Sequence, residues 1–322
     1  MKVQPTLAAT VAVISMGCAL PVMAQSAWPE KSVRIIIPWA PGGSTDIIGR
    51  ILAMELTARF KQQVVIDNRA GAGSIVGLQI ATASPPDGYT FMMTSTGYGF
   101  LIDKPKVPVD LVNSFAPVAM IGYGDSALVV TPTFPIKTVK ALIDLAKRRP
   151  GEILYASSGI GGFPHMNTEL FKMMTGTDLI HIPFKGGGPA TADVVAGHTQ
   201  MQLGSLISVK AQVDANRLRL IAIGSEKRSP KYPDIPTIGE SVPGYKSAIW
   251  FGLFVPPKTP GAIITRMNAE INDILVTPTM VKKLDEQGAT IVKMTPTEFG
   301  KLMVEEQNKW LEVIRTAKIR AE

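Results

Sequence analysis

Cysteine is almost absent from this 322-residue chain, in which Cys18 is the single example. One cysteine excludes an internal disulfide and the paired-cysteine motifs that bind zinc. Cys18 also lies in an apolar N-terminal stretch that has the features of a removable leader. The mature chain is therefore expected to have no thiol for nucleophilic catalysis.

The N-terminal stretch itself has very little charge, because Lys2 is the one charged residue before Glu30. Residues 6–22 are mostly small and apolar, and Val22-Met23-Ala24 has small residues at the positions that signal peptidase requires. We therefore expect residues 1–24 to be a signal peptide cleaved after Ala24, and the mature protein to be periplasmic. The alternative is a lipoprotein modified at Cys18, for which Ser15 is a poor context.

Long hydrophobic runs and concentrated charge are both missing from the rest of the chain. No segment after the leader holds about 18 uninterrupted apolar residues, so no transmembrane helix is predicted there. The formal net charge is +7, but the densest basic groups, Lys147-Arg148-Arg149 and Lys227-Arg228, are short and carry no interleaved aromatic residues. Nucleic-acid binding is not expected. The mild positive charge either favours anionic ligands or serves solubility alone.

The motifs of common enzyme classes are also absent. No serine stands in Gly-x-Ser-x-Gly, and no glycine loop leads into the Gly-Lys-Ser/Thr of a P-loop. His165, His181 and His198 lack metal-ligand spacing, so neither a metal nor a cofactor is expected. A triad of Ser157, His165 and Asp193 can be drawn, but its spacing is not diagnostic. We expect a protein without catalytic activity.

What the chain does contain is a repeated strand–loop–helix corner. In the first corner the apolar run Val33–Ile37 ends at Pro38, a Pro41-Gly42-Gly43 turn follows, and Ser44 or Thr45 is expected to cap the next helix. Such a corner directs unpaired backbone N–H groups and the positive end of a helix dipole at one spot, which suits an anion. A plain βα turn is the alternative reading of these residues.

Further corners have the same composition, at Asn68–Ser74, Ser157–His165 and Phe184–Ala190. The first of these contains Gly-x-Gly, but its spacing departs from the dinucleotide fingerprint and no acidic residue ends a second strand. Thr94-Ser95-Thr96 places hydroxyls at the carboxyl end of a strand, where parallel sheets bind ligands. We therefore predict that the protein holds a small anionic molecule.

The order of elements predicts an α/β protein with two lobes. Strand–helix units run to about residue 95 and resume after residue 138, and extended segments near 118–131 and 246–255 cross between the two halves. Residues 104–117 are expected to be irregular, and Gly122–Asp125 to separate two strands. The first lobe would then comprise residues 25–125 and 247–322, and the second residues 126–246. One continuous doubly wound sheet is the alternative.

Many short motifs keep one order along the mature chain. They are Pro38–Asp46, Asn68–Gly73, Pro86–Thr90, Phe115–Val118, Tyr155–Gly159, Ile182–Ala190, Arg228–Pro230, Asp234–Thr237, Pro243–Tyr245 and Trp250–Phe254. In these motifs the chain, from about Trp28 to Ile319, resembles the tripartite tricarboxylate transporter substrate-binding family, also called the Bug family of periplasmic receptors.

The resemblance implies a type II periplasmic-binding-protein fold, in which two mostly parallel sheets flanked by helices are joined by two extended hinge segments. It implies a monomeric receptor that captures a small carboxylate between its lobes, either a di- or tricarboxylate or an aromatic acid. The receptor would deliver this ligand to the membrane subunits of a tripartite tricarboxylate transporter. A ligand sensor for a signalling system and a periplasmic hydrolase are the alternatives.

The resemblance also assigns the ligand-binding residues, which lie on the glycine corners and strand ends. They are Gly42, Gly43, Thr45, Asp46, Ala72, Gly73, Ser74, Ser95 and Thr96 in the first lobe, and Ser157, Ser158, Gly159, His165, Lys185, Gly186 and Ser205 in the second. Asp46 is expected to shape its loop through hydrogen bonds to the backbone, because like charges repel.

Two departures from the family pattern bear on the ligand. Gly204-Ser205 stands where members often carry Phe-Asp, which argues against a ligand with an ammonium group. Gly97–Leu101 replaces an Asn-Pro-x-Leu-Tyr pattern. Tyr98, Phe100 and Phe163 either line a pocket for an aromatic or larger carboxylate or belong to the core.

Overall fold

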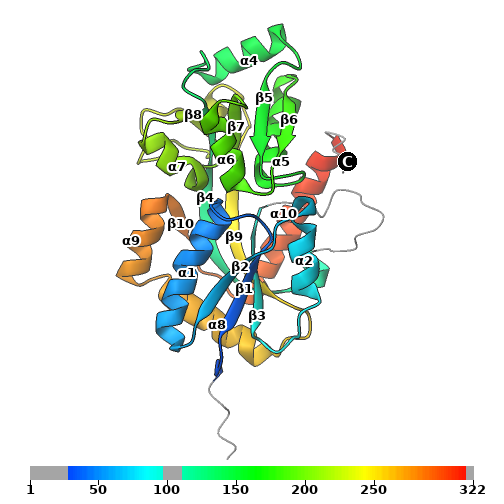
Figure 1. Cartoon of the computed structure of the whole chain (residues 1–322), viewed down its shortest axis with the longest axis vertical. Helices are drawn as coiled ribbons and strands as arrows, with labels where there is room; N and C mark the ends of the chain where they lie inside the picture. The colour runs from blue at the N-terminus through cyan, green and yellow to red at the C-terminus, as the bar shows by residue number, and fades with distance from the viewer. Residues whose placement is uncertain (1–27, 97–110, 317–322) are drawn as a thin grey trace, which may run out of the picture.

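The computed structural model describes residues 28–96 and 111–316, and two groups of elements follow each other along its longest axis (Figure 1). The first lobe is built on the parallel strands β2 (Val64–Asn68), β1 (Val33–Ile37) and β3 (Thr90–Ser95), and the antiparallel strand β9 (Ala248–Val255) lies beside β3. The leader and its cleavage site, Cys18, Tyr98 and Phe100 all lie outside the described residues.

Helices cover both faces of the first-lobe sheet. Val33, Ile35 and Ile37 pack under α1 (Ser44–Phe60), α8 (Gly261–Ile274) and α9 (Pro278–Gln287). Ile36 points to the other face, under α2 (Ile75–Thr82), α3 (Leu111–Ser114) and α10 (Pro296–Thr316). From Ile35 to Ile37 the strand β1 is buried on both faces, which is why these residues form a continuous apolar run and not an alternating pattern, while Arg34 in the same strand is only partly buried.

The second lobe repeats this plan. Its parallel strands are β6 (Ile180–Pro183), β5 (Leu154–Ser157) and β7 (Met201–Ser205), and β8 (Arg219–Ile223) is antiparallel to the strand that the lobes share. The helices α4 (Val139–Arg148) and α5 (Phe163–Thr175) pack on one face, and α6 (Gly187–Ala196) and α7 (Leu206–Asp214) on the other. The α/β fold predicted from the sequence is confirmed, with the parallel strands on the outer side of each sheet.

One long strand, β4 (Ala116–Val130), is shared by the two lobes. Up to Asp125 it pairs with β9, and from Ser126 onward it pairs with β7 and β8. The lobe boundaries derived from the sequence, 125/126 and 246/247, remain a proposal, which this change of partners supports.

The predicted break at Gly122–Asp125 is wrong, because these residues continue β4. A short strand that the sequence did not predict, β10 (Ala289–Ile291), pairs with β4 there. A Cβ on Gly122 would lie 2.2 Å from the carbonyl oxygen of Thr290, so the glycine permits this close pairing instead of making a turn. The irregular segment predicted at 104–117 is also partly wrong, since α3 and the first residues of β4 fall within it.

The last helix, α10, contacts both lobes. Phe299 and Met303 near its start belong to the core of the first lobe. Trp310, Val313 and Ile314 near its end form a small buried cluster with Met166 of α5, and Figure 1 shows α10 running from the first lobe up to α5. Within residues 28–96 and 111–316, no helix has the length and apolar character needed to cross a membrane.

Candidate ligand-binding site

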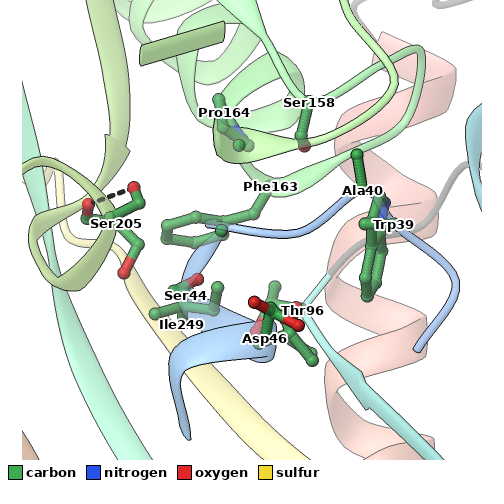
Figure 2. Close-up of a pocket in the computed structure, with 15 residues that line it drawn as sticks. Trp39, Ala40, Ser44, Asp46, Thr96, Ser158, Phe163, Pro164, Ser205 and Ile249 are labelled. Carbon is green, nitrogen blue, oxygen red and sulfur yellow. Dashed lines mark hydrogen bonds between the residues drawn. The ribbon is translucent and has the colours of Figure 1, made fainter. Parts of the chain in front are cut away.

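Two adjoining pockets lie between the lobes. The first, which we name the Ser205 pocket, encloses about 420 Å³ of empty space including its mouth. Figure 2 shows the Phe163 ring extending across it, above Ser44 and Ile249 in that view. Its lining is Trp39, Ala40, Gly43, Ser44, Thr45, Asp46, Ser95, Thr96, Ser158, Phe163, Pro164, Gly187, Ser205, Ser208 and Ile249.

The second, which we name the Lys185 pocket, encloses about 790 Å³ by the same measure. It shares Trp39 and Ser158 with the first, so the two pockets are neighbours in one interlobe cleft. Its lining is Trp39, Gly71, Ala72, Gly73, Ser74, Ser158, Gly159, Ile160, Pro183, Phe184 and Lys185. Lys185 is exposed and supplies the pocket's positive charge.

Asp46 supports the first glycine turn from inside. Its carboxylate accepts hydrogen bonds from the Gly42 backbone N–H at 3.0 Å, from Arg50 at 3.0 Å and from the Asn68 amide at 3.1 Å. Burial alone would raise the pKa of Asp46, but these hydrogen bonds outweigh burial and hold the pKa below its usual value. Asp46 therefore fixes the turn that carries Gly42, as expected from the sequence.

Four helices begin at the Ser205 pocket. The first residues of α1, α5 and α6 line it, as do Ser205, which precedes α7, and Ser208 in the first turn of α7. None of these four N-termini is capped by a side chain. By contrast, α4 and α9 are capped by Thr138 and Thr277, although α2 and α8 also begin without a side-chain cap. The expectation that Ser44 or Thr45 caps α1 is wrong, because the N-cap is Gly43.

The convergence of these helices gives the pocket a positive potential without a cation. Each helix N-terminus is equivalent to roughly half a positive charge, and its first N–H groups have no partner within the helix. Among the described residues that line the Ser205 pocket there is no lysine or arginine, and the charge of Asp46 is compensated by Arg50. The remaining polar groups of the lining are mainly hydroxyls.

Ser205 has the most informative of these hydroxyls. The residue is 3% exposed, and its Oγ has no hydrogen-bond partner. Thr45 and Ser95, in contrast, are hydrogen-bonded to each other at 2.9 Å, and Thr96 accepts the Trp250 backbone N–H at 2.9 Å. A buried hydroxyl without a partner is costly, so Ser205 Oγ is available for a ligand.

The Lys185 pocket is bounded by a strained turn. Ala72, Gly73 and Ser74 have φ values of +46°, +62° and +86°, all in the left-handed region. Left-handed backbone at non-glycine residues is uncommon and is concentrated at functional sites. This turn is the second glycine corner of the sequence, and it faces Ser158 and Gly159 across the cleft.

Most of the predicted site residues line the two pockets, and four lie behind the lining. Gly42 and Gly186 lie in the turns where the lobes meet, and Ser157 and His165 lie beneath the loop that carries Ser158 and Gly159. Ser157 Oγ accepts the Gly159 backbone N–H at 3.1 Å, and His165 Nδ1 accepts the Gly161 backbone N–H at 3.0 Å. The structure thus shows these two side chains supporting the loop.

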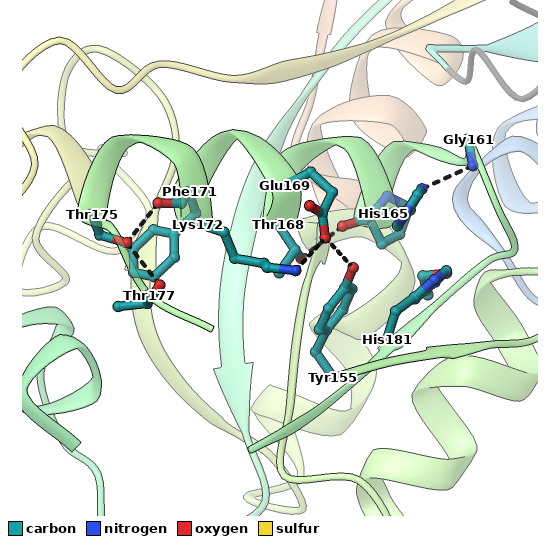
Figure 3. A network of polar contacts seen from close by, with 12 residues as sticks. Tyr155, Gly161, His165, Thr168, Glu169, Phe171, Lys172, Thr175, Thr177 and His181 are labelled. Atoms are coloured by element: carbon teal, nitrogen blue, oxygen red, sulfur yellow. Dashed lines mark hydrogen bonds and ion pairs between the residues drawn. The ribbon is translucent and has the colours of Figure 1, made fainter. Parts of the chain in front are cut away.

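His165 is part of a larger buried network (Figure 3). Its ring stacks on His181 with 4.1 Å between centroids, and His181 Nε2 lies 2.5 Å from Ser157 Oγ. Tyr155 stacks on the other side of His181 and donates to Glu169, which also pairs with Lys172. The network ties the loop to α5 and β6.

Both imidazoles of this network are neutral at ordinary pH. Burial, assisted by Lys172, lowers the pKa of His165 to about 4. Burial and the neighbouring His165 lower the pKa of His181 to about 3, against the opposite effect of Glu169. Since Nδ1 of His165 accepts a hydrogen bond, its proton lies on Nε2.

Several lining residues were not assigned from the sequence. Trp39 and Gly187 lie within the quoted motifs Pro38–Asp46 and Ile182–Ala190, so a wider assignment of those motifs would have included them. Ser208 lies in the first turn of α7, three residues after the assigned Ser205. Phe163 has both of the roles left open for it, since it lines the pocket and belongs to a buried hydrophobic cluster. Ile249 lines the pocket only because β9 crosses beneath it, and no local pattern in the sequence predicts this position. No group of three potential metal-binding side chains occurs among the residues that the structure describes.

A family model decides the chain's affiliation. The model described as tripartite tricarboxylate transporter family receptor matches residues 48–319. This chain belongs to that family. Its members are solute-binding receptors and not enzymes, so the resemblance seen in the sequence motifs is confirmed.

Relatives of this receptor family show the same affiliation. Protein BugT of Bordetella pertussis is 34% identical over 94% of this chain and 94% of its own length. The solved structure of R. palustris Rpa4515 with adipate is 32% identical, with a TM-score of 0.87 over 91% of this chain and 99% of that one. The solved structure of periplasmic binding protein BugD is 25% identical, with a TM-score of 0.87 over 92% of this chain and all of that one. The two-lobed periplasmic-binding-protein fold is thus confirmed.

Proposed function

We propose that this protein is a periplasmic receptor that binds a small carboxylate between its lobes and delivers it to the membrane subunits of a tripartite tricarboxylate transporter. The observation that carries the proposal is the convergence of four uncapped helix N-termini on the Ser205 pocket. The adipate bound to the R. palustris relative supports the same ligand class.

The carboxylate group would lie in the Ser205 pocket. Its oxygens would accept hydrogen bonds from the first backbone N–H groups of the helices and from Ser205 Oγ. The body of the ligand would contact the apolar walls formed by Trp39, Phe163 and Ile249. A second polar group, as in a di- or tricarboxylate, would reach the Lys185 pocket past Ser158.

Three further expectations accompany this function. The protein would be exported with residues 1–24 removed, it would act as a monomer, and the sixteen residues assigned from the sequence would form or support its site. A sensor that passes the ligand-bound form to a signalling partner would use the same pockets. Genes for the transporter's membrane subunits beside the receptor gene would favour the transport role.

A thermal-shift screen tests the proposal. The mature protein would be unfolded and refolded to remove bound ligand, and then mixed with adipate, citrate, benzoate or glutamate. The matched controls are adipamide and benzamide, which keep the shape of the acids but not the charge. A ligand at about 100 times its Kd stabilises the folded form by about 2.7 kcal/mol, which corresponds to a rise of roughly 5–10 °C.

A rise of this size with an acid and none with its amide would support the receptor function. No rise with any carboxylate would contradict it. Release of the free acid and ammonia from adipamide or benzamide during incubation would instead favour the hydrolase alternative, and chromatography of the recovered compound detects this outcome.

A further inference from the structure

The two lobes meet through backbone atoms of glycines. Gly42 and Gly43 of the first corner face Gly187 and Gly188 at the start of α6, and we name these four residues the glycine seam. A Cβ on Gly43 would lie 3.4 Å from the Gly187 nitrogen, and one on Gly187 would lie 3.3 Å from the Cα of Gly43. Beside the seam, the Ala40 backbone N–H donates to the Lys185 carbonyl oxygen at 2.9 Å.

Gly188 is the tightest point of the seam. A Cβ there would lie 2.3 Å from the Pro41 carbonyl oxygen and 3.2 Å from the Cα of Gly42. The three atoms nearest to that Cβ belong to Pro41 and Gly42, in the opposite lobe. The closest obstacles to the added methyl group therefore come from the opposite lobe.

Neither of the usual reasons for a glycine applies at Gly188. The residue does not have the left-handed backbone that glycine alone adopts readily, and it lines neither pocket. In a helix, alanine is favoured over glycine. The feature that does require a glycine is the approach of the other lobe.

We propose that the glycine seam sets how closely the lobes approach, and that Gly188 thereby controls ligand affinity without contacting the ligand. Four helix N-termini can act on one ligand only when both lobes lie against it, because α1 belongs to one lobe and α5, α6 and α7 to the other. A methyl group at position 188 would hold the lobes apart. A ligand bound against one lobe would then lose part of its contact with the helix N-termini of the other. The inference rests on the proposed function only for the identity of the ligand.

The test compares Gly188→Ala with Gly261→Ala. Gly261 is the first residue of α8, and a Cβ there would have no atom within 4 Å, so both variants gain an alanine at a helix start but only one meets the other lobe. Calorimetric titration with adipate and benzoate should give a Kd at least tenfold higher for Gly188→Ala, and an unchanged Kd for Gly261→Ala. Small-angle scattering at saturating ligand should show a larger radius of gyration for Gly188→Ala alone.

Each outcome bears on the proposal. Equal affinity and equal compaction of Gly188→Ala and wild type would overturn it. A Gly188→Ala variant that is unfolded by circular dichroism would also overturn it, since the inference requires that its own lobe tolerates the methyl group. Wild-type protein that binds neither these two acids nor citrate nor glutamate would contradict the carboxylate function instead. The seam would then be tested by scattering without ligand, where Gly188→Ala should be more extended than wild type.

Discussion

Ser126 and Ser205 stand opposite each other on β4 and β7, and the hydroxyl of each is buried without a hydrogen-bond partner. They differ in one respect, which is that Ser205 lines the interlobe pocket and Ser126 lines neither pocket. The chain thus contains an internal control for the role of a buried hydroxyl in binding.

Ser205→Ala should weaken carboxylate binding by about 10- to 100-fold. The reason is that a hydrogen bond to a charged group contributes about 1.5–3 kcal/mol. Ser126→Ala should leave the Kd unchanged, although it removes the same hydroxyl from the neighbouring strand. Calorimetric titration of both variants with adipate and benzoate measures the difference. Equal effects of the two substitutions would show that Ser205 does not contact the ligand.

Asp46→Asn should lower the free energy of unfolding at neutral pH by about 1–3 kcal/mol. Arg50 loses its charged partner, and the amide keeps only one of the two oxygens that accept hydrogen bonds from Gly42, Arg50 and Asn68. The pKa of Asp46 is lower in the folded protein than in the unfolded chain. Its charged form therefore stabilises the fold above the unfolded pKa, and this contribution is lost as the pH falls through the lowered folded value.

Urea unfolding between pH 3 and 7 measures this dependence. The difference in unfolding free energy between wild type and Asp46→Asn should be constant from about pH 5 upward and should narrow below about pH 4. Asp144→Asn is the control, since Asp144 forms an exposed pair with Lys140 on α4 and such pairs contribute little. A difference in unfolding free energy that does not change with pH would contradict stabilisation of the fold by the charged form of Asp46.

The stacked pair His165 and His181 should make the fold sensitive to mild acid. Their pKa values fall from the ordinary 6.5 to about 4 and about 3, so between pH 6.5 and pH 4 the unfolded chain binds protons that the folded protein does not. Stability should therefore decrease as the pH falls through this window, by an amount on the order of 3 kcal/mol for each histidine. The charged groups facing the pair are Glu169 and Lys172.

His165→Asn tests this dependence without removing the acceptor of the Gly161 N–H, because the amide oxygen can replace Nδ1. The variant should show a flatter fall in unfolding free energy between pH 7 and pH 5 than wild type. His198→Asn, which alters an exposed histidine beside Asp193, should keep the wild-type slope. Equal slopes for all three proteins would show that the pair does not titrate on unfolding.

Trp310→Ala should destabilise the protein by about 3 kcal/mol, because it removes the largest side chain of the cluster that joins α10 to Met166 of α5. Amide hydrogen exchange should rise in residues 160–170 of the second lobe as well as in α10 itself. Val304→Ala, an exposed position on the same helix, should change neither property. Faster exchange confined to α10 would show that this helix does not support the second lobe.

The sequence by itself determined the local elements and the family. The β-branched run of β1, the glycine corners and the helix starts depend on residues close together in the chain, where dihedral preference and hydrophobic period act directly. The same patterns placed Gly43, Thr45, Ser95 and Ser158 at corners and strand ends, and the resemblance to the family added Ser205; all five line the pocket. The role of Asp46 also followed, because its partner Gly42 is only four residues away.

The tertiary structure alone decided what distant segments do to one another. Gly122 belongs to a continuous strand because β10 pairs with it, and His165 faces His181 because β6 lies beside β5. Four N-termini meet at one pocket, and Gly188 lies against Pro41, only because two lobes come together. Such contacts join residues that are far apart in the sequence, so no local pattern predicts them. Their geometry is fixed by the packing of whole sheets and helices.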